Sequence, residues 1–314
     1  MNTALRPAMQ TQAEMSLDAP VCVGVERFDM PLAVRLADTA STPCADDIVL
    51  YWLGQAGFVI DCQGRRMLID PYLSDTLADK YRGTRYPHVR MMPAPLVPAD
   101  LDRLDVVLCT HRHTDHMDPG TLQPLAARFP ALRFVVPAAS IDEAMRRCGV
   151  GIERLIPVDA GMRVRIGDDC HVSPIPSAHE TLEADAEGRY PWLGYVIETC
   201  GLRLYHSGDC VPYPTLSERV AQQRPDVALL PVNGRDEARS GNGVPGNFTL
   251  DEAVDLAHAA RVPAMIVHHY GLFDFNTIEP DAIDARIASE RSALTLLRAQ
   301  TQQAWRLTRT ADPT

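Results

Sequence analysis

The stretch that decides the fold is His111-Arg112-His113-Thr114-Asp115-His116, which directly follows the apolar run Asp-Val-Val-Leu-Cys-Thr at positions 105–110. Such a run is typical of a buried strand, so three histidines and a carboxylate stand where a strand ends. Imidazole and carboxylate groups suit borderline divalent ions such as zinc and manganese. The pattern predicts a binuclear metal site in which His111 and His113 converge on one ion while Asp115 and His116 face a second. A solvated polar loop with incidental histidines is the alternative.

Three further residues are candidate ligands, because one loop cannot complete two coordination shells. His179, Asp209 and His269 each follow a β-type run, at positions 171–175, 202–205 and 264–267, and each is flanked by polar or small residues. Any one of them alone would more often be a surface residue or a satisfied core residue. Their shared position after a strand, together with the cluster at 111–116, favours a common site.

Apolar runs and turn signals predict the order of the secondary structure. We expect strands at 48–53, 58–62, 66–69, 105–110, 133–137, 163–166, 171–175, 193–199, 202–206, 227–231, 264–268 and 304–307. Helices are expected at 121–128, 141–147, 251–260 and 280–299, with Thr249 and Glu252 at capping-box spacing before the third. Residues 72–100 are predicted to form a long irregular loop. The simplest architecture is two β-rich sheets packed face to face with helices outside, as one domain.

Length and composition limit the class of protein. The chain has 314 residues, 46% hydrophobic and 23% charged, which is an ordinary globular balance. Its net charge of −11 argues against a nucleic-acid-binding surface. Residues 1–46 lack sustained periodicity, so we interpret them as an N-terminal extension, of which residues 1 to about 40 should be dispensable for metal binding. Residues 47–314 form the predicted catalytic domain.

The cysteines and the apolar runs bear on location. Eight cysteines lie far apart with no CxxC pair, which favours buried free thiols in a reducing compartment over a set of disulfides. The first 30 residues hold no apolar core of a signal peptide, and no apolar run approaches the roughly 18 residues that span a bilayer. We therefore expect a cytoplasmic protein without a membrane partner. The oligomeric state stays open, a homo-oligomer included.

The motifs in this order resemble those of the metallo-β-lactamase superfamily: HxHxDH, a lone His, a Gly-Asp after a strand, and a late His. The resemblance covers most of residues 47–308. The segments Tyr-Trp-Leu-Gly-Gln-Ala-Gly at 51–57, Leu-Ile-Asp-Pro-Tyr-Leu at 68–73 and Asn-Gly-Arg at 233–235 resemble the branch that contains the ascorbate-6-phosphate lactonase. The resemblance implies an α+β fold, a four-layered αββα sandwich with its site at one edge between the sheets.

The same resemblance implies a role for each candidate. The first metal would be bound by His111, His113 and His179, and the second by Asp115, His116 and His269, with Asp209 bridging the two. His268 competes with His269, which we prefer because His-Tyr-Gly-x-Phe at 269–273 resembles the ligand segment of the superfamily. Asp70 resembles an early Asp that orients ligands. A turn-forming Asp before Pro71 is an equal alternative.

Two divalent ions, zinc or manganese, would lower the pKa of a shared water so that hydroxide forms at neutral pH. That hydroxide would attack a carbonyl or phosphoryl centre, with Asp115 and Asp209 as the catalytic carboxylates that accept and relay the proton. No GxSxG or P-loop segment is present in the sequence, and the one GxGxxG match, Gly-Asn-Gly-Val-Pro-Gly at 241–246, does not directly follow a β-type run. Nothing therefore indicates a serine nucleophile or a nucleotide cofactor.

Residues for the substrate are less constrained. Arg235 is predicted to clamp a phosphate or carboxylate, with a surface salt bridge as the alternative, and Tyr270 either contacts substrate or packs as support. A basic lid over the site would use Arg82, Arg85, His88 and Arg90, although a solvated charged loop explains these residues more simply.

Three functions fit these patterns. The first is a metal-dependent hydrolase of a small anionic lactone or ester. The second is a phosphodiesterase, because N-acylethanolamine phospholipases of the superfamily share the Asp-Pro and HxHxDH motifs. The third is a non-catalytic metal-binding domain, which would be expected to lose some of the seven ligand positions that are filled here.

Overall fold

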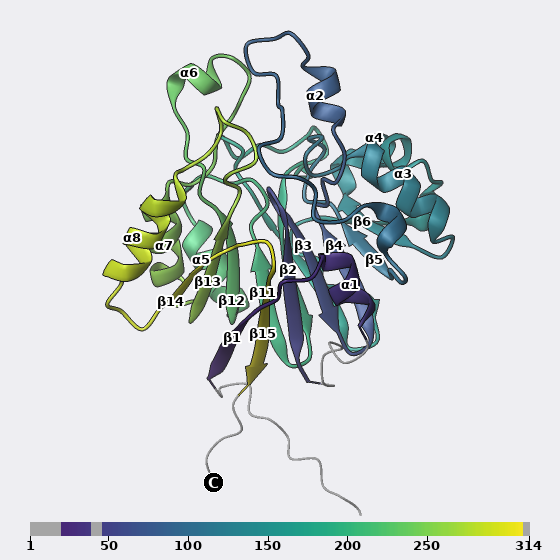
Figure 1. Ribbon diagram of the computed structural model, residues 1–314. Coiled ribbons are helices and arrows are strands. Elements are labelled where there is room, and N and C mark those ends of the chain that lie inside the picture. The colour runs from purple at the N-terminus through teal and green to yellow at the C-terminus, as the bar shows by residue number, and fades with distance from the viewer. Residues whose placement is uncertain (1–19, 39–45, 310–314) are drawn as a thin grey trace, which may run out of the picture.

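Two β-sheets lie face to face in the computed structural model, which describes residues 20–38 and 46–309 (Figure 1). The first sheet has eight strands in the spatial order β1 (Val21–Arg27), β15 (Gln303–Arg309), β2 (Ile48–Gly54), β3 (Gly57–Cys62), β4 (Arg65–Ile69), β5 (Val106–Leu108), β6 (Arg133–Pro137) and β7 (Leu155–Val158). The second has seven, in the order β14 (Thr295–Arg298), β13 (Ala264–His268), β12 (Val227–Pro231), β11 (Leu202–His206), β10 (Leu193–Thr199), β9 (Cys170–Pro176) and β8 (Val164–Gly167). The expected two-sheet α+β fold is confirmed.

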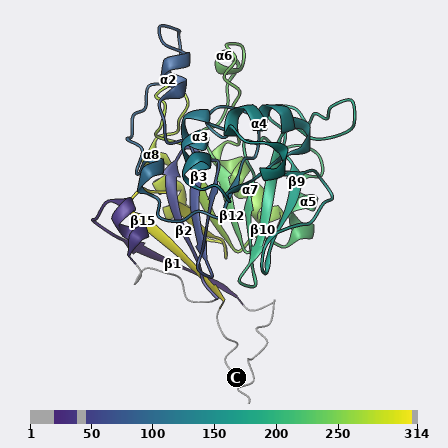
Figure 2. The same cartoon turned by 90° about the vertical axis from the view of Figure 1, so that its right-hand side faces the viewer.

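Helices cover the outer faces of both sheets (Figures 1 and 2). On the first sheet lie α1 (Leu32–Ala37), α3 (Pro119–Arg128) and α4 (Ile141–Cys148), and on the second α5 (Leu216–Gln223), α7 (Leu250–Ala259) and α8 (Pro280–Ser289). The short helices α2 (Thr76–Lys80) and α6 (Glu237–Ser240) project beyond one edge of the sheets. The predicted capping box of Thr249 and Glu252 begins α7. None of the helices in the described segments is long and apolar enough to cross a membrane.

The central strands are buried on both faces, which explains their unbroken apolar sequence. In β2, Leu50 and Trp52 belong to the hydrophobic cluster between the sheets, whereas Val49 and Tyr51 belong to the cluster under α1 and α3. Successive side chains of a strand point to opposite faces, so one run serves two cores.

Strand direction brings the candidate ligands to one edge. The strands from β4 to β7 run parallel to one another, and so do those from β11 to β14. The loops that follow β5, β9, β11 and β13 therefore leave the two sheets at the same edge, beneath α2 and α6 (Figure 1). Ligand sites of α/β sheets commonly lie at such strand ends.

The N-terminal extension needs correction for residues 20–38. Strand β1 pairs antiparallel with β15 along its whole length, and Phe28, Leu32 and Leu36 are buried in the first sheet's outer cluster. This segment is therefore part of the domain. Val21 and Val23 pack against the hydrophobic cluster between the sheets, but β1 is short and most of its residues are exposed, so its sequence signal is weak. Residues 1–19 and 39–45 lie outside the described residues.

The helix expected at 280–299 is also corrected, because α8 ends at Ser289 and β14 follows as an edge strand. Glu290 adopts extended backbone, and Leu296 of β14 is buried between two more exposed neighbours, which is a strand pattern. Strand β7 and helices α2, α5 and α6 were not expected from the sequence. The other boundaries agree to within about two residues, except that β5 is shorter than its predicted run.

The docking of α1 can be tested with two aliphatic residues of the same helix. We expect Leu32→Ala to lower the free energy of unfolding by about 2–4 kcal/mol, because Leu32 is 4% exposed and leaves a cavity. Val34→Ala is the matched control, since Val34 is 54% exposed and its truncation changes stability by less than about 0.5 kcal/mol. Urea unfolding of both variants measures the difference. Equal effects would show that α1 does not contribute to the core.

Candidate metal centre

The loop after β5 folds back on itself and carries four of the candidate ligands. The backbone amides of His116 and Met117 donate to the carbonyl oxygen of His113, at 3.1 and 2.7 Å, which closes a tight turn. Asp118 then caps α3 by accepting a hydrogen bond from the amide of Gly120. Turn and cap together fix where the imidazoles project.

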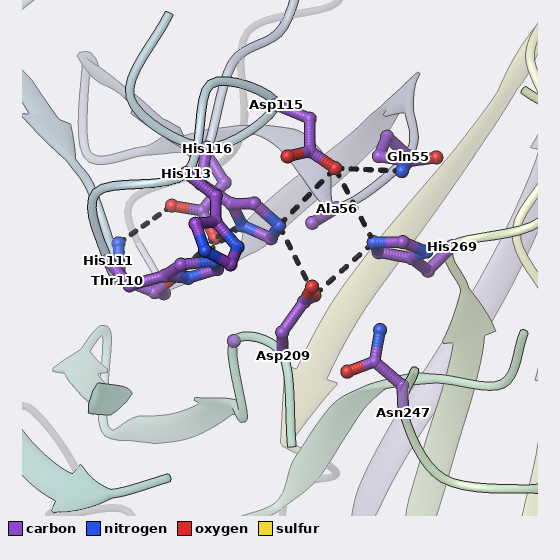
Figure 3. A network of polar contacts seen from close by, with 12 residues as sticks. Gln55, Ala56, Thr110, His111, His113, Asp115, His116, Asp209, Asn247 and His269 are labelled. Atoms are coloured by element: carbon purple, nitrogen blue, oxygen red, sulfur yellow. Dashed lines mark hydrogen bonds and ion pairs between the residues drawn. The ribbon is translucent and has the colours of Figure 1, made fainter. Parts of the chain in front are cut away.

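All seven predicted ligands meet in one cluster. Figure 3 labels six of them, all except His179. Their donor atoms form three overlapping triads, each with all atoms within 4.8 Å of one another: His111, His113 and His179; His111, His116 and Asp209; and Asp115, His116 and His269. Asp209 Oδ1 lies 3.2 Å from His116 Nε2 and 3.3 Å from His269 Nε2. His179 Nε2 lies 3.2 Å from His113 Nδ1.

Several ligand atoms of the cluster have no hydrogen-bond partner, which is expected of atoms that bind a metal ion. Within the described residues, His111 Nε2, His116 Nε2, Asp209 Oδ1 and His269 Nε2 are buried and make no hydrogen bond of normal geometry, apart from the ion-pair contacts of Asp209 with the two histidines. A buried polar atom without a partner costs about 1–3 kcal/mol, so several at one point require an explanation. Nitrogen and carboxylate oxygen are the donors that borderline divalent ions take. The cluster could therefore hold metal.

Asp70 lies behind the cluster. Its Oδ2 is 2.7 Å from His116 Nδ1, and it accepts hydrogen bonds from the amide and the hydroxyl of Thr110 at 2.8 and 2.6 Å. The Thr110 hydroxyl donates its hydrogen to Asp70. It can therefore only accept a hydrogen bond from His111 Nδ1, 3.1 Å away. Both imidazoles are thereby held with Nε2 toward the cluster. The expectation that Asp70 orients ligands agrees with these contacts.

Close packing of Gly208 positions Asp209 at the end of β11. Gly208 has φ +61°, and a Cβ atom there would lie 2.8 Å from the carbonyl oxygen of Leu193 and 2.9 Å from Thr110 Cβ. Only glycine fits this approach. The Asn247 side chain accepts a hydrogen bond from the amide of Cys210 at 2.9 Å, which fixes the other side of Asp209.

Gln55, in the turn between β2 and β3, is a site residue that the sequence did not single out. Its Nε2 donates to Asp115 Oδ2 at 2.9 Å, and its carbonyl oxygen accepts from the amide of His269 at 3.0 Å and from Trp52 Nε1 at 3.0 Å. Gln55 is 1% exposed and has φ +49°. A polar residue between glycines, joining two fully buried strands, was the available signal.

Of the two neighbouring histidines, the structure brings His269 to the cluster. His269 has φ +64°, so the chain leaves the line of β13 at this residue. His268 instead stacks on His206, with ring centroids 5.0 Å apart, and packs edge-on against Phe58. Burial, with His206 next, holds the pKa of His268 well below its usual value. It is a neutral core residue.

The two predicted substrate residues do not face the cluster. The guanidinium of Arg235 forms two hydrogen bonds with Glu252, at 2.6 and 2.7 Å, and a third with the carbonyl oxygen of Asn247. The Tyr270 hydroxyl donates to the carbonyl oxygen of Ala299, and its ring stacks on Trp52 at 5.2 Å. The structure thus shows the alternative for each, an ion pair for Arg235 and packing support for Tyr270, because nearness to a ligand in sequence does not fix where a side chain points.

The electrostatics of the cluster favour the ligand forms of most residues. Burial lowers the pKa of His111 and His113, and lowers that of His179 to about 4, so these imidazoles are neutral. Burial raises the pKa of Asp209, but His116 and His269 outweigh it and hold it well below the usual value. Burial lowers the pKa of His116, yet Asp209, Asp70 and Asp115 together hold it well above 6.5. A proton and a metal ion therefore compete for His116.

A family profile described as "Beta-lactamase superfamily domain" matches residues 65–270, about two thirds of the chain and all seven ligands. The chain belongs to the metallo-β-lactamase superfamily. It is a metal-dependent hydrolase of that superfamily.

Two relatives and one solved structure illustrate the likeness. A UPF0173 metal-dependent hydrolase of Myxococcus xanthus is 28% identical over 83% of this chain and 83% of its own length. The N-acyl-phosphatidylethanolamine-hydrolyzing phospholipase D 1 of Caenorhabditis elegans is 23% identical over 73% of this chain and 65% of its own. The metallo hydrolase Igni18 of Ignicoccus hospitalis superposes with a TM-score of 0.62 at 18% identity, covering 84% of this chain and 99% of Igni18. The last likeness shows the fold.

The two neighbouring histidines give a direct test of the site. We expect His269→Ala to remove about one metal ion per chain and to lower kcat by roughly 10²-fold or more, given a metal's usual share of transition-state stabilisation. His268→Ala should keep its metal and lose stability, because it leaves a hole beside Phe58 and His206. The metal content per chain and the kcat of both variants distinguish the two histidines. The opposite pattern would make His268 the ligand.

Gln55 also has a matched control. Gln55→Leu removes the donor to Asp115 at similar volume, and we expect metal affinity to fall about 10- to 100-fold, the usual effect of losing a partner that orients a ligand. Gln63→Leu is the control, since Gln63 has φ +47° in an exposed turn away from the cluster. Competition with a chelator measures both affinities. Equal affinities would restrict Gln55 to a role in the turn.

Proposed function

We propose that the protein uses two divalent ions, zinc or manganese, to hydrolyse a small anionic lactone or ester. The observation that carries this proposal is the division of the donors. One triad is made of His111, His113 and His179 and another of Asp115, His116 and His269, and they share no residue. Asp209 contacts members of both sides, which is the position of a bridging ligand.

Two ions held by these residues would lower the pKa of a shared water, so that a nucleophile forms at neutral pH, and would act as a Lewis acid. The protein's side chains orient the ligands and transfer protons. Asp115 and Asp209 both line the pocket above the cluster. Asp115 is the more accessible, with 18% of its side chain exposed against 6% for Asp209. We assign Asp115 the acceptance of the proton that the attacking water releases and its transfer to the leaving oxygen. Asp209 would hold the ions from both sides and assist this relay.

The choice of a lactone or ester rests on the motifs at 51–57, 68–73 and 233–235, which resemble the ascorbate-6-phosphate lactonase branch. The pocket over the cluster has a volume of about 130 Å³, which suits a small substrate. A phosphodiester is the second candidate, because a relative is named as a phospholipase D. A non-catalytic metal-binding role is disfavoured, since all seven ligand positions are filled and converge.

We also place the protein in the cytoplasm, acting on a small molecule rather than on nucleic acid or a membrane. The seven cysteines of the described residues are free, and all but Cys22 are buried. Free thiols are typical of a reducing compartment. The net charge of −11 opposes binding to a polyanion.

The proposal is tested with the purified protein. We expect about two transition-metal ions per chain and turnover of a simple aromatic lactone that exceeds turnover of bis-p-nitrophenyl phosphate. Asp209→Ala should lower metal content and abolish hydrolysis together, because Asp209 joins the two triads. His258→Ala, which changes an exposed histidine of α7, is the control and should leave both unchanged.

Two results would contradict this proposal. Full activity of metal-free protein under strict chelation would exclude the metal mechanism. Turnover of the phosphodiester alone would keep the metals and replace the substrate class.

A further inference from the structure

The cluster forms the floor of a pocket whose walls come from two projecting segments. On one side lie Lys80, Tyr81 and His88, and on the other the loop at 243–245 that follows α6. An adjoining pocket of about 230 Å³ shares Tyr81, His88 and the 243–244 segment and continues outward to Arg85. Figure 1 shows α2 and α6 standing on either side of this edge. A substrate therefore reaches the cluster between the two segments, which we call the entry channel.

Aromatic packing holds the first wall in place. The Tyr81 ring stacks on His88, with centroids 4.4 Å apart and planes at 23°. His88 packs edge-on against Phe273 at 5.0 Å and Phe275 at 4.8 Å. Phe273 follows the ligand His269 closely in the chain. The wall that carries Lys80 and Tyr81 is thus tied to the ligand loop, and its position relative to the metals is defined.

The entry channel is cationic in an acidic protein. The chain has 41 Asp and Glu against 30 Lys and Arg. Among the described residues that line the two pockets, the cluster's own Asp115 and Asp209 are the only carboxylates. Three cations line the channel, namely Lys80, Arg85 and Arg147. Metal-binding carboxylates are neutralised by their ions, so the remaining field favours an anion.

Two of the three cations are held by the protein. Arg147 pairs with Glu143 and donates to Thr114 Oγ1 and to the carbonyl oxygen of Met117, each at 3.1 Å. Arg85 lies 3.5 Å from Asn242 Oδ1 and over the ring of Tyr86, in the outer pocket. Arg82 and Arg90, which the sequence grouped with them, contact Asp79 and backbone carbonyls and do not line the channel.

Lys80 is the cation left for a ligand. Its Nζ lies 4.8 Å from the centroid of the Tyr81 ring, and no carboxylate of the described residues forms an ion pair with it. It is exposed and is the single lysine of the 314-residue chain. An ammonium offers three rotatable donors on a flexible stem, which suits a compact anionic group.

We propose that Lys80 anchors a second negatively charged group of the substrate, so that the protein selects lactones or esters carrying a carboxylate or phosphate beside the bond that is cleaved. The substrate's body lies against Tyr81 while its anion contacts Nζ. Lys80 is a binding residue and takes no part in the chemistry. This inference rests on the proposed function, and it assigns selectivity to a residue outside the metal cluster.

A substrate pair separates selectivity from catalysis. The acid is 5-oxotetrahydrofuran-2-carboxylate, a lactone with a carboxylate, and its carboxamide is the neutral partner. We expect Lys80→Met to raise KM for the acid about 10- to 100-fold, the usual worth of a hydrogen bond to a charged group, with kcat and metal content unchanged. Turnover of the carboxamide should not change. Lys80→Arg should keep most of the preference for the acid.

Two controls refine the test. Arg82→Met removes an exposed cation nearby that does not line the channel, and it should leave KM for the acid unchanged. Because the chain holds one lysine, Lys80 is the single side-chain amine that an amine-selective acetylating reagent can modify, and hydroxylamine treatment removes acetyl groups from tyrosine and histidine. Acetylation should raise KM for the acid in the unaltered protein and not in Lys80→Arg. Inorganic phosphate as a competitive inhibitor, weakened by Lys80→Met, would identify a phosphate rather than a carboxylate as the better anion.

The outcomes that contradict the two proposals differ. Equal KM values for the acid in the unaltered protein and in Lys80→Met, with normal turnover of the carboxamide, would overturn the role of Lys80 alone. Failure of the metal-loaded protein to hydrolyse either lactone would overturn the proposed function. In that case the affinity for the acid, measured by calorimetry, tests the role of Lys80. A lower affinity in Lys80→Met supports binding of the anion by Lys80, and an unchanged affinity excludes it.

Discussion

Buried donor atoms that must share one small space are the constraint on which the rest of the structure depends. His111, His116, Asp209 and His269 each bring an unsatisfied buried atom to the cluster. Behind the cluster, Asp70 contacts the far nitrogen of His116 and Thr110 contacts that of His111. Gln55 donates to Asp115. Desolvation without a partner is unfavourable, so the protein without metal bears a cost that an ion removes. Metal binding and stability are therefore linked.

The turn between β2 and β3 is where the two halves of the molecule are joined at this centre. Gln55 contacts Asp115, which follows β5 of the first sheet, and the amide of His269, which follows β13 of the second. The next residue, Ala56, offers its carbonyl oxygen to His206 Nε2 at 2.9 Å. The loops that carry Asp115 and His269 are thus both anchored to the same hairpin. The distance between triads is set by sheet packing, which is stiff because β2 and β3 are fully buried.

The ligands could be predicted from the sequence because their signal is local and repeated: a polar residue directly after an apolar strand. The fold followed from the same runs. The predictions failed where the outcome depends on the direction of a side chain or on a strand far away in the sequence. Arg235 and Tyr270 lie beside the right residues but point to Glu252 and Ala299. Strand β1 requires β15, about 280 residues away, before it has a sheet to join. Gln55 and Lys80 are single polar residues whose roles appear only when other segments surround them.

Chemistry and selectivity therefore lie on different kinds of structure. The metal ligands follow strands whose ladders and buried side chains fix them, so a given motif produces one geometry. The entry channel is built from α2, from a loop after α6 and from aromatic packing between loops. Such segments can change sequence without disturbing the sheets, since few core residues depend on them. A family can keep one reaction and vary its substrates in this way. Hence the family resemblance identifies the hydrolase but does not determine its substrate. In our proposal the single lysine at the entry channel determines the substrate's charge.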